Sequence, residues 1–329
     1  MIEQVANNIY RIKVTLPRNP LKALNSYLIR GEDRCVLVDT GFRIPECREA
    51  LLAGLEELGV SCREIDYFIT HLHSDHSGLA TELVGEGHVI YMSKVDLEWL
   101  QESSLHSEAR AASIAKLLKS GVPDRVLKTI YGNTGEKGSL YTIDVTHPAY
   151  IKVEEGFELA VGEYRFRCIS TPGHTPGHIC LWEPEHKIML TGDHVLFDIT
   201  PNITQWFGVK DSLRSYMTSL EKIRDYPVKC VLPGHREPGD YKARIDSLLY
   251  HHRQRLDEVI DILRDNPGMN AYEIAGKMTW SIRAANWDTF PDTQKYFAVG
   301  ECLSHLDYLT EEGTAVRYED EDCYRYKLN

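Results

Sequence analysis

Short runs of β-branched and aromatic residues alternate with turn residues over the first 80 positions of the chain. Such runs predict β-strands, and we expect them at residues 9–14, 25–29, 35–38 and 66–70. Pro45 and Gly59 bound a segment that fits a helix from about 45 to 58, because proline is tolerated in a first helical turn and glycine ends helices. Residues 93–130 have a partly apolar, helical pattern, whereas 131–149 resist assignment.

The strand pattern returns in the second half, where we expect strands at residues 151–153, 164–169, 179–182, 188–190 and 229–232. Helices are expected near 211–225 and from about 242 to 264, where Asn266-Pro267-Gly268 ends the second one. Both halves thus run strands, helix, strands. This order favours an α+β fold, an αββα sandwich whose two sheets pack face to face with helices outside.

Composition narrows the class of protein. The chain has 329 residues, 43% apolar and 26% charged, which is typical of a globular protein with one large domain or one domain plus an appendage. A net charge of −12 argues against a broad phosphate-binding surface. The eight cysteines form no C-x-x-C pair and indicate free thiols in a reducing compartment. Without a secretory signal pattern or a membrane-length apolar run, we expect a cytoplasmic protein with no membrane partner.

The densest chemistry lies directly after the predicted strand at 66–70. His71, His73, Asp75 and His76 place three imidazoles and a carboxylate within six residues. These are the ligand types that Zn²⁺ and similar cations prefer. A mixed nitrogen and oxygen set at a strand end favours a site for two metal ions over a structural zinc site.

Three later segments repeat this form, each a strand that ends in a glycine followed by His or Asp. They are Pro172-Gly173-His174, Thr191-Gly192-Asp193 and Pro233-Gly234-His235. Glycine before the ligand lets the backbone turn tightly and approach an ion. Loops held by a rigid sheet commonly carry functional side chains. We therefore add His174, Asp193 and His235 to the candidate ligands.

These motifs resemble the metallo-β-lactamase-fold superfamily over residues 5–240. His71-x-His73-x-Asp75-His76 matches its H-x-H-x-D-H signature, and residues 38–41 match its early Asp-Thr-Gly element. The resemblance implies two divalent metal ions, with zinc favoured and iron or manganese as alternatives. It implies one ion on His71, His73 and His174, and another on Asp75, His76 and His235. Asp193 would bridge them, and Asp75 would have a catalytic role on a hydroxide shared by both ions.

Two positions separate the subclasses of this superfamily. Flavodiiron relatives carry glutamate where this chain has His73, and the β-lactamases commonly carry a cysteine ligand where it has Asp193. We therefore expect hydrolysis of a small ester or thioester, as in glyoxalase II-like members. The alternative enzyme is an endoribonuclease or phosphodiesterase of the lactamase-like subgroup. A different class is a non-catalytic, metal-containing regulatory or partner-binding protein, although structural zinc sites are normally closed four-ligand sites.

We place a domain boundary near residue 265, with a catalytic domain at 1–265 and a small domain at 266–329. Predicted helices at 271–275 and 297–309, followed by a hairpin, resemble the winged-helix-like C-terminal domain of the lactamase-like endoribonuclease subgroup. From residue 268 onward the chain has six basic and eleven acidic residues, which disfavours a nucleic-acid partner. Nucleic acid is kept as an alternative partner. We expect a small-molecule substrate, with a homodimer as an open alternative. Residues of about 93–149 form a helical, lid-like insertion in this scheme.

Several polar residues keep two interpretations. Asp39 either caps a turn or bonds a ligand imidazole and fixes its tautomer. His178 is read as a structural histidine, with a substrate contact as the alternative. His194 follows Asp193 but would point away from it, so we do not expect it to bind metal. His251 and His252 are expected on a solvated helix face.

Overall fold

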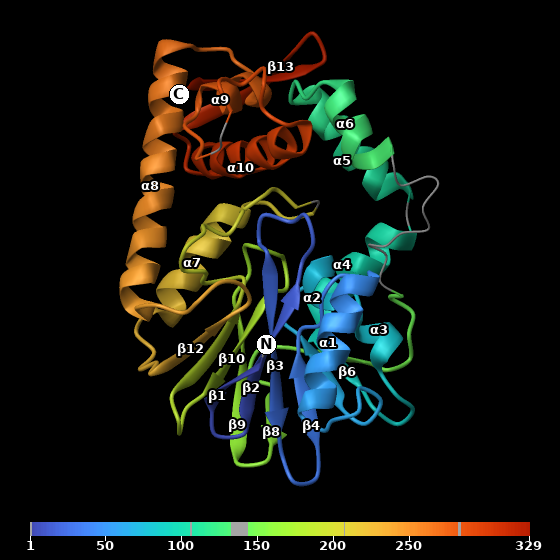
Figure 1. Cartoon of the computed structure of the whole chain (residues 1–329). Helices are drawn as coiled ribbons and strands as arrows, with labels where there is room; N and C mark the ends of the chain where they lie inside the picture. Colours follow the sequence, from blue (N-terminus) through green and yellow to red (C-terminus); the bar gives the residue numbers. More distant parts are fainter. Residues whose placement is uncertain (1, 106, 133–143, 207, 282–283) are drawn as a thin grey trace. The chain divides into compact units, whose positions relative to one another are not determined.

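The computed structural model of the chain describes residues 2–105, 107–132, 144–206, 208–281 and 284–329 (Figure 1). It divides into two compact units, and each is described by itself. The first unit comprises Met1–Gln101, Ser139–Pro201 and Ser219–Ile245, and the second comprises Glu102–Gly138, Asn202–Thr218 and Asp246–Asn329. The predicted domain boundary near residue 265 stays a prediction.

A seven-stranded sheet forms one half of the first unit, and its strands lie in chain order. The strands β1 to β4 pair antiparallel, whereas β4 to β7 pair parallel. They are β1 (Ile2–Ala6), β2 (Ile9–Thr15), β3 (Ala23–Arg30), β4 (Cys35–Val38), β5 (Asp66–Ile69), β6 (Ile90–Ser93) and β7 (Tyr150–Val153). In the parallel part of the sheet the carboxyl ends of β4, β5 and β6 therefore meet at one edge.

The second sheet has five strands in the order β12-β11-β10-β9-β8. They are β8 (Glu158–Val161), β9 (Tyr164–Ser170), β10 (Ile179–Glu183), β11 (Ile188–Gly192) and β12 (Cys230–Pro233). Side chains of both sheets form one apolar core, which includes Ile9, Tyr27, Val38, Phe68, Leu159, Phe166, Leu181 and Leu190. The shared core confirms the predicted face-to-face packing of two sheets.

Strands such as β5, β10 and β11 are buried on both faces, as expected for strands that helices cover on the outer side. Helix α1 (Pro45–Glu57) packs on the first sheet, where a Cβ at Gly54 would lie 2.5 Å from Ile12 Cγ2. Two short helices, α2 (Ser74–Ser77) and α3 (Ala80–Leu83), follow β5 (Figure 1). On the second sheet every residue of β10 is buried, and Trp182 packs against the ring of Tyr226 at 5.3 Å.

The elements predicted from the hydrophobic pattern are present, and three further strands are not predicted by it. β1, β6 and β8 are four or five residues long. β6 directly precedes the helical pattern that begins near residue 93, so the helical signal masks it. The predicted helical segment 93–130 is three helices, α4 (Lys94–Leu105), α5 (Ser107–Lys119) and α6 (Asp124–Tyr131). Residues 106 and 133–143 of the predicted lid-like insertion lie outside the described residues, and the insertion's role stays a prediction.

The second unit is mostly helical. It contains α5, α6, α9 (Ala271–Lys277), α10 (Asp292–Glu311) and most of α8 (Tyr241–Asp265). A hairpin of β13 (Ala315–Asp320) and β14 (Cys323–Leu328) turns at two residues of positive φ, Glu321 and Asp322. Helix α9 begins with a capping box between Asn270 and Glu273. The predicted helices and acidic hairpin tip are therefore present, while the winged-helix assignment stays a prediction.

One expectation for α8 is wrong. His252 is fully buried rather than solvated, and its Nδ1 lies 3.3 Å from Nε2 of His305 on α10. His305 Nδ1 donates to the carbonyl of Glu301 at 2.7 Å, so its Nε2 accepts the hydrogen bond from His252. Tyr216 of α7 (Ser212–Arg224) packs against His252, with the two ring centroids 5.4 Å apart. The pair is neutral and interior because three helices of this unit pack around it.

Lowering the pH from 7.5 to 5.5 is expected to destabilise the second unit. Burial lowers the pKa of His305 to about 3 and holds that of His252 well below its usual value. Below a pH of about 6.5 the unfolded chain binds protons that this folded pair does not. The free energy of unfolding then falls by roughly 1 kcal/mol per pH unit for each histidine. Backbone hydrogen exchange in α8 and α10 at both pH values measures the change.

The variant His252→Gln isolates this effect, because glutamine keeps a hydrogen-bonding side chain but does not titrate. We expect its protection against exchange to fall less steeply between the two pH values than that of the unmodified protein. An equally steep fall in both proteins would show that other groups carry the pH dependence.

Within the described residues, no helix is both long enough and apolar enough to cross a membrane.

Candidate metal centre

The ends of four strands bring the seven candidate side chains together in the first unit. His71, His73, Asp75 and His76 follow β5, His174 follows β9, Asp193 follows β11 and His235 follows β12. Their nitrogen and oxygen atoms form three overlapping sets, each within 4.8 Å. These sets are His71 with His73 and His174, His71 with His76 and Asp193, and Asp75 with His76 and His235. All seven positions chosen from the sequence therefore meet in one place.

The first group consists of His71, His73 and His174. Their rings meet edge to edge, with centroid distances of 4.8 Å between His71 and His73 and 4.6 Å between His73 and His174. Nε2 of His71 and Nδ1 of His73 approach to 3.1 Å. His174 is nearly buried, at 5% exposure. Three imidazoles thus direct nitrogen atoms at one small volume.

The second group consists of Asp75, His76 and His235. The Nε2 atoms of the two imidazoles are 3.2 Å apart, and Asp75 Oδ2 lies 3.3 Å from Nε2 of His235. Asp193 lies between the groups. Its Oδ1 is 3.4 Å from His76 Nε2, and its Oδ2 is 3.8 Å from His174 Nε2. One carboxylate therefore faces imidazoles of both groups.

Hydrogen bonds on the far side of the rings fix their orientation. Nδ1 of His76 donates to Asp39 Oδ2 at 2.7 Å, and Nδ1 of His235 donates to the carbonyl of Ala23 at 2.7 Å. Nδ1 of His71 lies 3.0 Å from Oγ1 of Thr70, which itself donates to Asp39. In the neutral form of each ring these bonds keep the proton on Nδ1, which leaves the lone pair of Nε2 toward the centre. This arrangement is typical of histidines that bind metal ions.

The charges of the groups fit a cation. Burial lowers the pKa of His73 to about 3 and that of His71 well below its usual value, so both imidazoles are neutral. Burial alone would raise the pKa of Asp75, but His76 and His235 outweigh it and lower that pKa to about 2. The same competition, with His235 and His76 as the main partners, holds the pKa of Asp193 below its usual range. Burial would lower the pKa of His76 and His235, but Asp193 and the neighbouring carboxylates outweigh it and raise the pKa of both. A cation bound beside these carboxylates would take the place of the protons that the two imidazoles carry.

Two glycines let the ligand loops approach this closely. Gly192 has a φ of +48°, and a Cβ there would lie 2.8 Å from Nε2 of His178. A Cβ at Gly234 would lie 2.6 Å from Oδ1 of Asp193. A larger residue at Gly234 would collide with Asp193, and one at Gly192 would collide with His178 and Thr70.

His178 and Asp39 both bond protein groups at the centre. Nδ1 of the buried His178 bonds Oγ1 of Thr171 at 2.8 Å, and its Nε2 accepts from the backbone N–H of Asp193 at 3.2 Å. This agrees with the structural interpretation of His178. Asp39, held at a φ of +61°, accepts from the backbone and hydroxyl of Thr70 as well as from His76. Asp39 therefore makes the contact that the second interpretation expects, a hydrogen bond from the imidazole of His76. His194 is buried but belongs to none of the three sets.

Replacing Asp39 with Asn is expected to weaken metal binding by about 10- to 100-fold, the range typical of outer partners of metal-bound histidines. In the unmodified protein His76 and Thr70 donate three hydrogen bonds to the two carboxylate oxygens of Asp39. Asparagine has a single acceptor oxygen, so it cannot accept all three. Competition between the protein and a chromophoric chelator for Zn²⁺ measures the affinity. The control is Asp66→Asn on β5, whose carboxylate bonds Arg34 and the backbone of Val89. Equal affinities for Asp39→Asn and the control would contradict the prediction.

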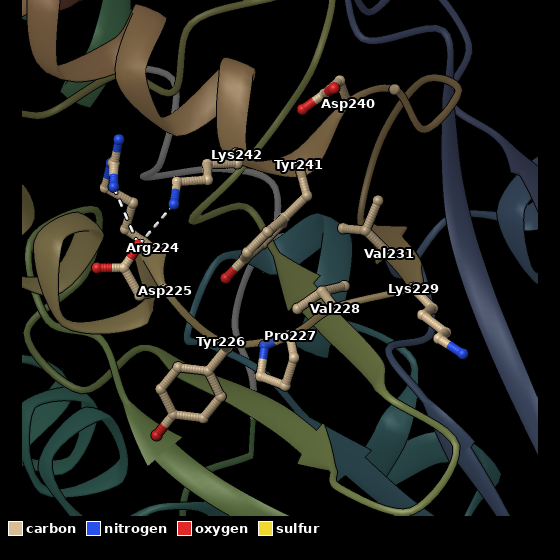
Figure 2. Close-up of a pocket in the computed structure, with 11 residues that line it drawn as sticks. Arg224, Asp225, Tyr226, Pro227, Val228, Lys229, Val231, Asp240, Tyr241 and Lys242 are labelled. Atoms are coloured by element: carbon tan, nitrogen blue, oxygen red, sulfur yellow. Dashed lines mark hydrogen bonds and ion pairs between the residues drawn. The ribbon is translucent and has the colours of Figure 1, made fainter.

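A separate pocket of about 500 Å³ lies beside the start of β12, whereas His235 follows the end of that strand (Figure 2). Within the described part of the chain its lining includes none of the seven clustered side chains. Asp225 pairs there with Arg224 at 3.0 Å and with Lys242 at 2.8 Å. The described lining holds two carboxylates and three basic side chains but no histidine, so the pocket lacks the imidazoles of the cluster.

Comparisons with known proteins agree with this geometry. A model of the Metallo-beta-lactamase superfamily matches residues 21–235, and a model described as Metallo-beta-lactamase-like, C-terminal domain matches residues 288–329. The Beta-lactamase-like protein 2 homolog of Caenorhabditis elegans is 26% identical over 294 residues, 86% of this chain and 82% of that protein. The Acyl-coenzyme A thioesterase MBLAC2 of Gallus gallus is 27% identical over 217 residues, 64% of this chain and 72% of that protein. A crystal structure of a metallo-beta-lactamase family protein from Thermus thermophilus matches with a TM-score of 0.82 and 27% identity, covering 99% of this chain and 100% of that one.

Proposed function

Since the chain belongs to the metallo-beta-lactamase superfamily and is a metal-dependent hydrolase, we propose that it hydrolyses a small ester or thioester at the seven-residue cluster. The observation that carries this proposal is the convergence of five imidazoles and two carboxylates in two adjoining groups. The Gallus gallus relative is named an acyl-coenzyme A thioesterase, which supports a thioester among the candidate substrates.

In this proposal the first group, His71, His73 and His174, holds one divalent cation and the second group, Asp75, His76 and His235, holds another. Asp193, whose two oxygens face imidazoles of both groups, would serve both sites. When bound, such paired ions lower the pKa of a water molecule that they share and polarise the bond under attack. Zinc is favoured, with iron and manganese as alternatives, because histidine and aspartate accept all three.

The chain's own residues then orient the reaction. Asp75 is ionised, and its Oδ2 faces His76 and His235, so Oδ1 can accept a hydrogen bond from a water molecule and hold it in one direction. Asp39 and the carbonyl of Ala23 keep the proton of His76 and His235 on Nδ1, away from the reacting atoms. These contacts exist before substrate binds, so the orientation is built into the fold.

Cleavage of RNA or another phosphodiester is the second candidate. The match of residues 288–329 to a lactamase-like C-terminal model and the predicted winged-helix form of 266–329 favour it. The acidic excess of that segment opposes it, because a phosphate backbone binds clustered basic residues. We therefore place a small-molecule substrate first.

Metal content per chain together with a substrate panel tests the proposal. We expect about two divalent ions per chain and turnover of acyl thioesters or simple esters that a chelator abolishes and added Zn²⁺ restores. The variant His73→Ala should lose this turnover. Metal-dependent cleavage of single-stranded RNA, with no turnover of thioesters, would replace the proposal with the second candidate. A fully metal-loaded protein that is inert on esters, thioesters and phosphodiesters would overturn both and favour a non-catalytic role.

A further inference from the structure

Asp96 is a buried carboxylate that does not belong to the seven clustered side chains. It lies in the first turn of α4, directly after β6, and is fully inaccessible to solvent. β6 pairs in parallel with β5, so the start of α4 and the loop after β5 emerge at the same edge of the first sheet. The carboxylate of Asp96 therefore lies next to the loop that carries His71 and His73.

Both oxygens of Asp96 accept hydrogen bonds from two different loops. Oδ2 accepts from the backbone N–H of Leu72 at 2.9 Å and from the hydroxyl of Thr175 at 2.8 Å. Oδ1 accepts from the backbone N–H of Gly177 at 2.6 Å. Leu72 lies between His71 and His73, while Thr175 follows His174. One side chain thus joins the two loops that supply the first group.

Local structure keeps Asp96 in this position. Its own backbone N–H donates to Oγ of Ser93 at 3.3 Å, which fixes the start of α4. At Gly177 a Cβ would lie 2.3 Å from Ser93 Oγ and 2.9 Å from Asp96 Oδ1. The glycine in the Pro176-Gly177 step is therefore needed because the start of α4 approaches its Cα so closely. The second group has other supports, namely Asp39 behind His76 and the carbonyl of Ala23 behind His235.

We infer that Asp96 is a positioning residue that sets the separation of His71 and His73 from His174 and so determines the metal affinity of the first group, but not of the second. The inference rests on the proposed function insofar as the cluster binds metal ions. Burial raises the pKa of Asp96 to about 7, against the three hydrogen bonds that lower it. Above that pH a carboxylate suits the task because it supplies acceptors alone, and all three of its partners are donors. An amide at this position would turn an N–H group toward one of those donors.

The test uses Co²⁺ binding to the full chain, with each group measured alone. The variant His235→Ala leaves the first group intact, and His174→Ala leaves the second. We expect Asp96→Asn to weaken Co²⁺ binding about 10-fold in the His235→Ala background, the lower end of the range for outer partners. In the His174→Ala background it should change the affinity by less than about twofold. Thr175→Val, which removes one of the three hydrogen bonds, should have the same selectivity with a smaller effect.

A matched control is Glu183→Gln, since Glu183 is a buried carboxylate of the same unit that bonds His186. It should leave Co²⁺ binding unchanged in both backgrounds. Equal weakening of both groups by Asp96→Asn, or no weakening of the first, would overturn the inference. Thr175→Val decides the matter if Asp96→Asn does not fold. If the unmodified protein binds no Co²⁺, the proposed function itself fails, a result separate from failure of Asp96 alone.

Discussion

Replacing Asp193 with Ala is expected to lower kcat/KM on the thioester or ester substrate by at least about a thousandfold. Asp193 faces His76 through one oxygen, and His174 and His235 through the other. Without this carboxylate the two groups lose the ligand they share and the negative charge that favours cations there. Metal ions typically stabilise a transition state by several kcal/mol, and about 4 kcal/mol corresponds to a thousandfold in rate. Steady-state kinetics and metal content per chain measure both losses.

Two further variants define what Asp193 contributes. Asp193→Asn keeps the shape but not the charge, and we expect it to lose most of the activity as well. Asp198→Ala, an exposed aspartate five residues later, should retain full activity. Retention of wild-type kcat/KM by Asp193→Ala would mean that the shared-ligand role belongs to another residue.

Replacing Phe68 with Ala is expected to destabilise the first unit by about 3–5 kcal/mol, the usual cost of removing a buried aromatic side chain. Phe68 is fully buried in the core between the two sheets, and its ring lies 6.5 Å from that of Tyr91. β5 ends one residue later and leads to His71, so the cavity would lie in the strand that carries the first candidate ligands. Urea unfolding, with both proteins loaded with the same metal, measures the loss.

The control for this substitution is Phe297→Ala, since that side chain is 49% exposed. A surface substitution of this kind usually changes the free energy of unfolding by no more than about 0.5 kcal/mol. A loss below about 1 kcal/mol for Phe68→Ala would show that the surrounding core collapses into the space. Metal affinity of the Phe68→Ala variant in the absence of urea would then report how far β5 has moved.

The candidate site could be predicted from sequence because its ligands are chemically distinctive and local in form. His71, His73, Asp75 and His76 lie within six residues, and the later ligands each follow a glycine at a strand end. The sheets could be predicted for a similar reason, since strands such as β9 alternate between buried and exposed positions. These patterns are properties of short segments and need no knowledge of tertiary contacts.

Features that depend on distant contacts could not be predicted in this way. Asp96 looks like an ordinary helix N-terminal aspartate, and only the parallel pairing of β5 with β6 places it against Leu72 and Gly177. His252 stands beside Arg253 and Arg255, which suggested a solvated face, yet packing against α10 buries it. In both cases the deciding neighbour lies far along the sequence, where periodicity carries no information.

The order of the ligands along the chain has a consequence during synthesis on the ribosome. The first group is complete once His174 has emerged, whereas the second waits for His235, which follows residues 202–218 of the other unit. Chains emerge from the N-terminus and fold in that order. A growing chain therefore carries the three histidines of the first group before His235 has been made. Cations present during synthesis would then meet the side chains of the first group before those of the second.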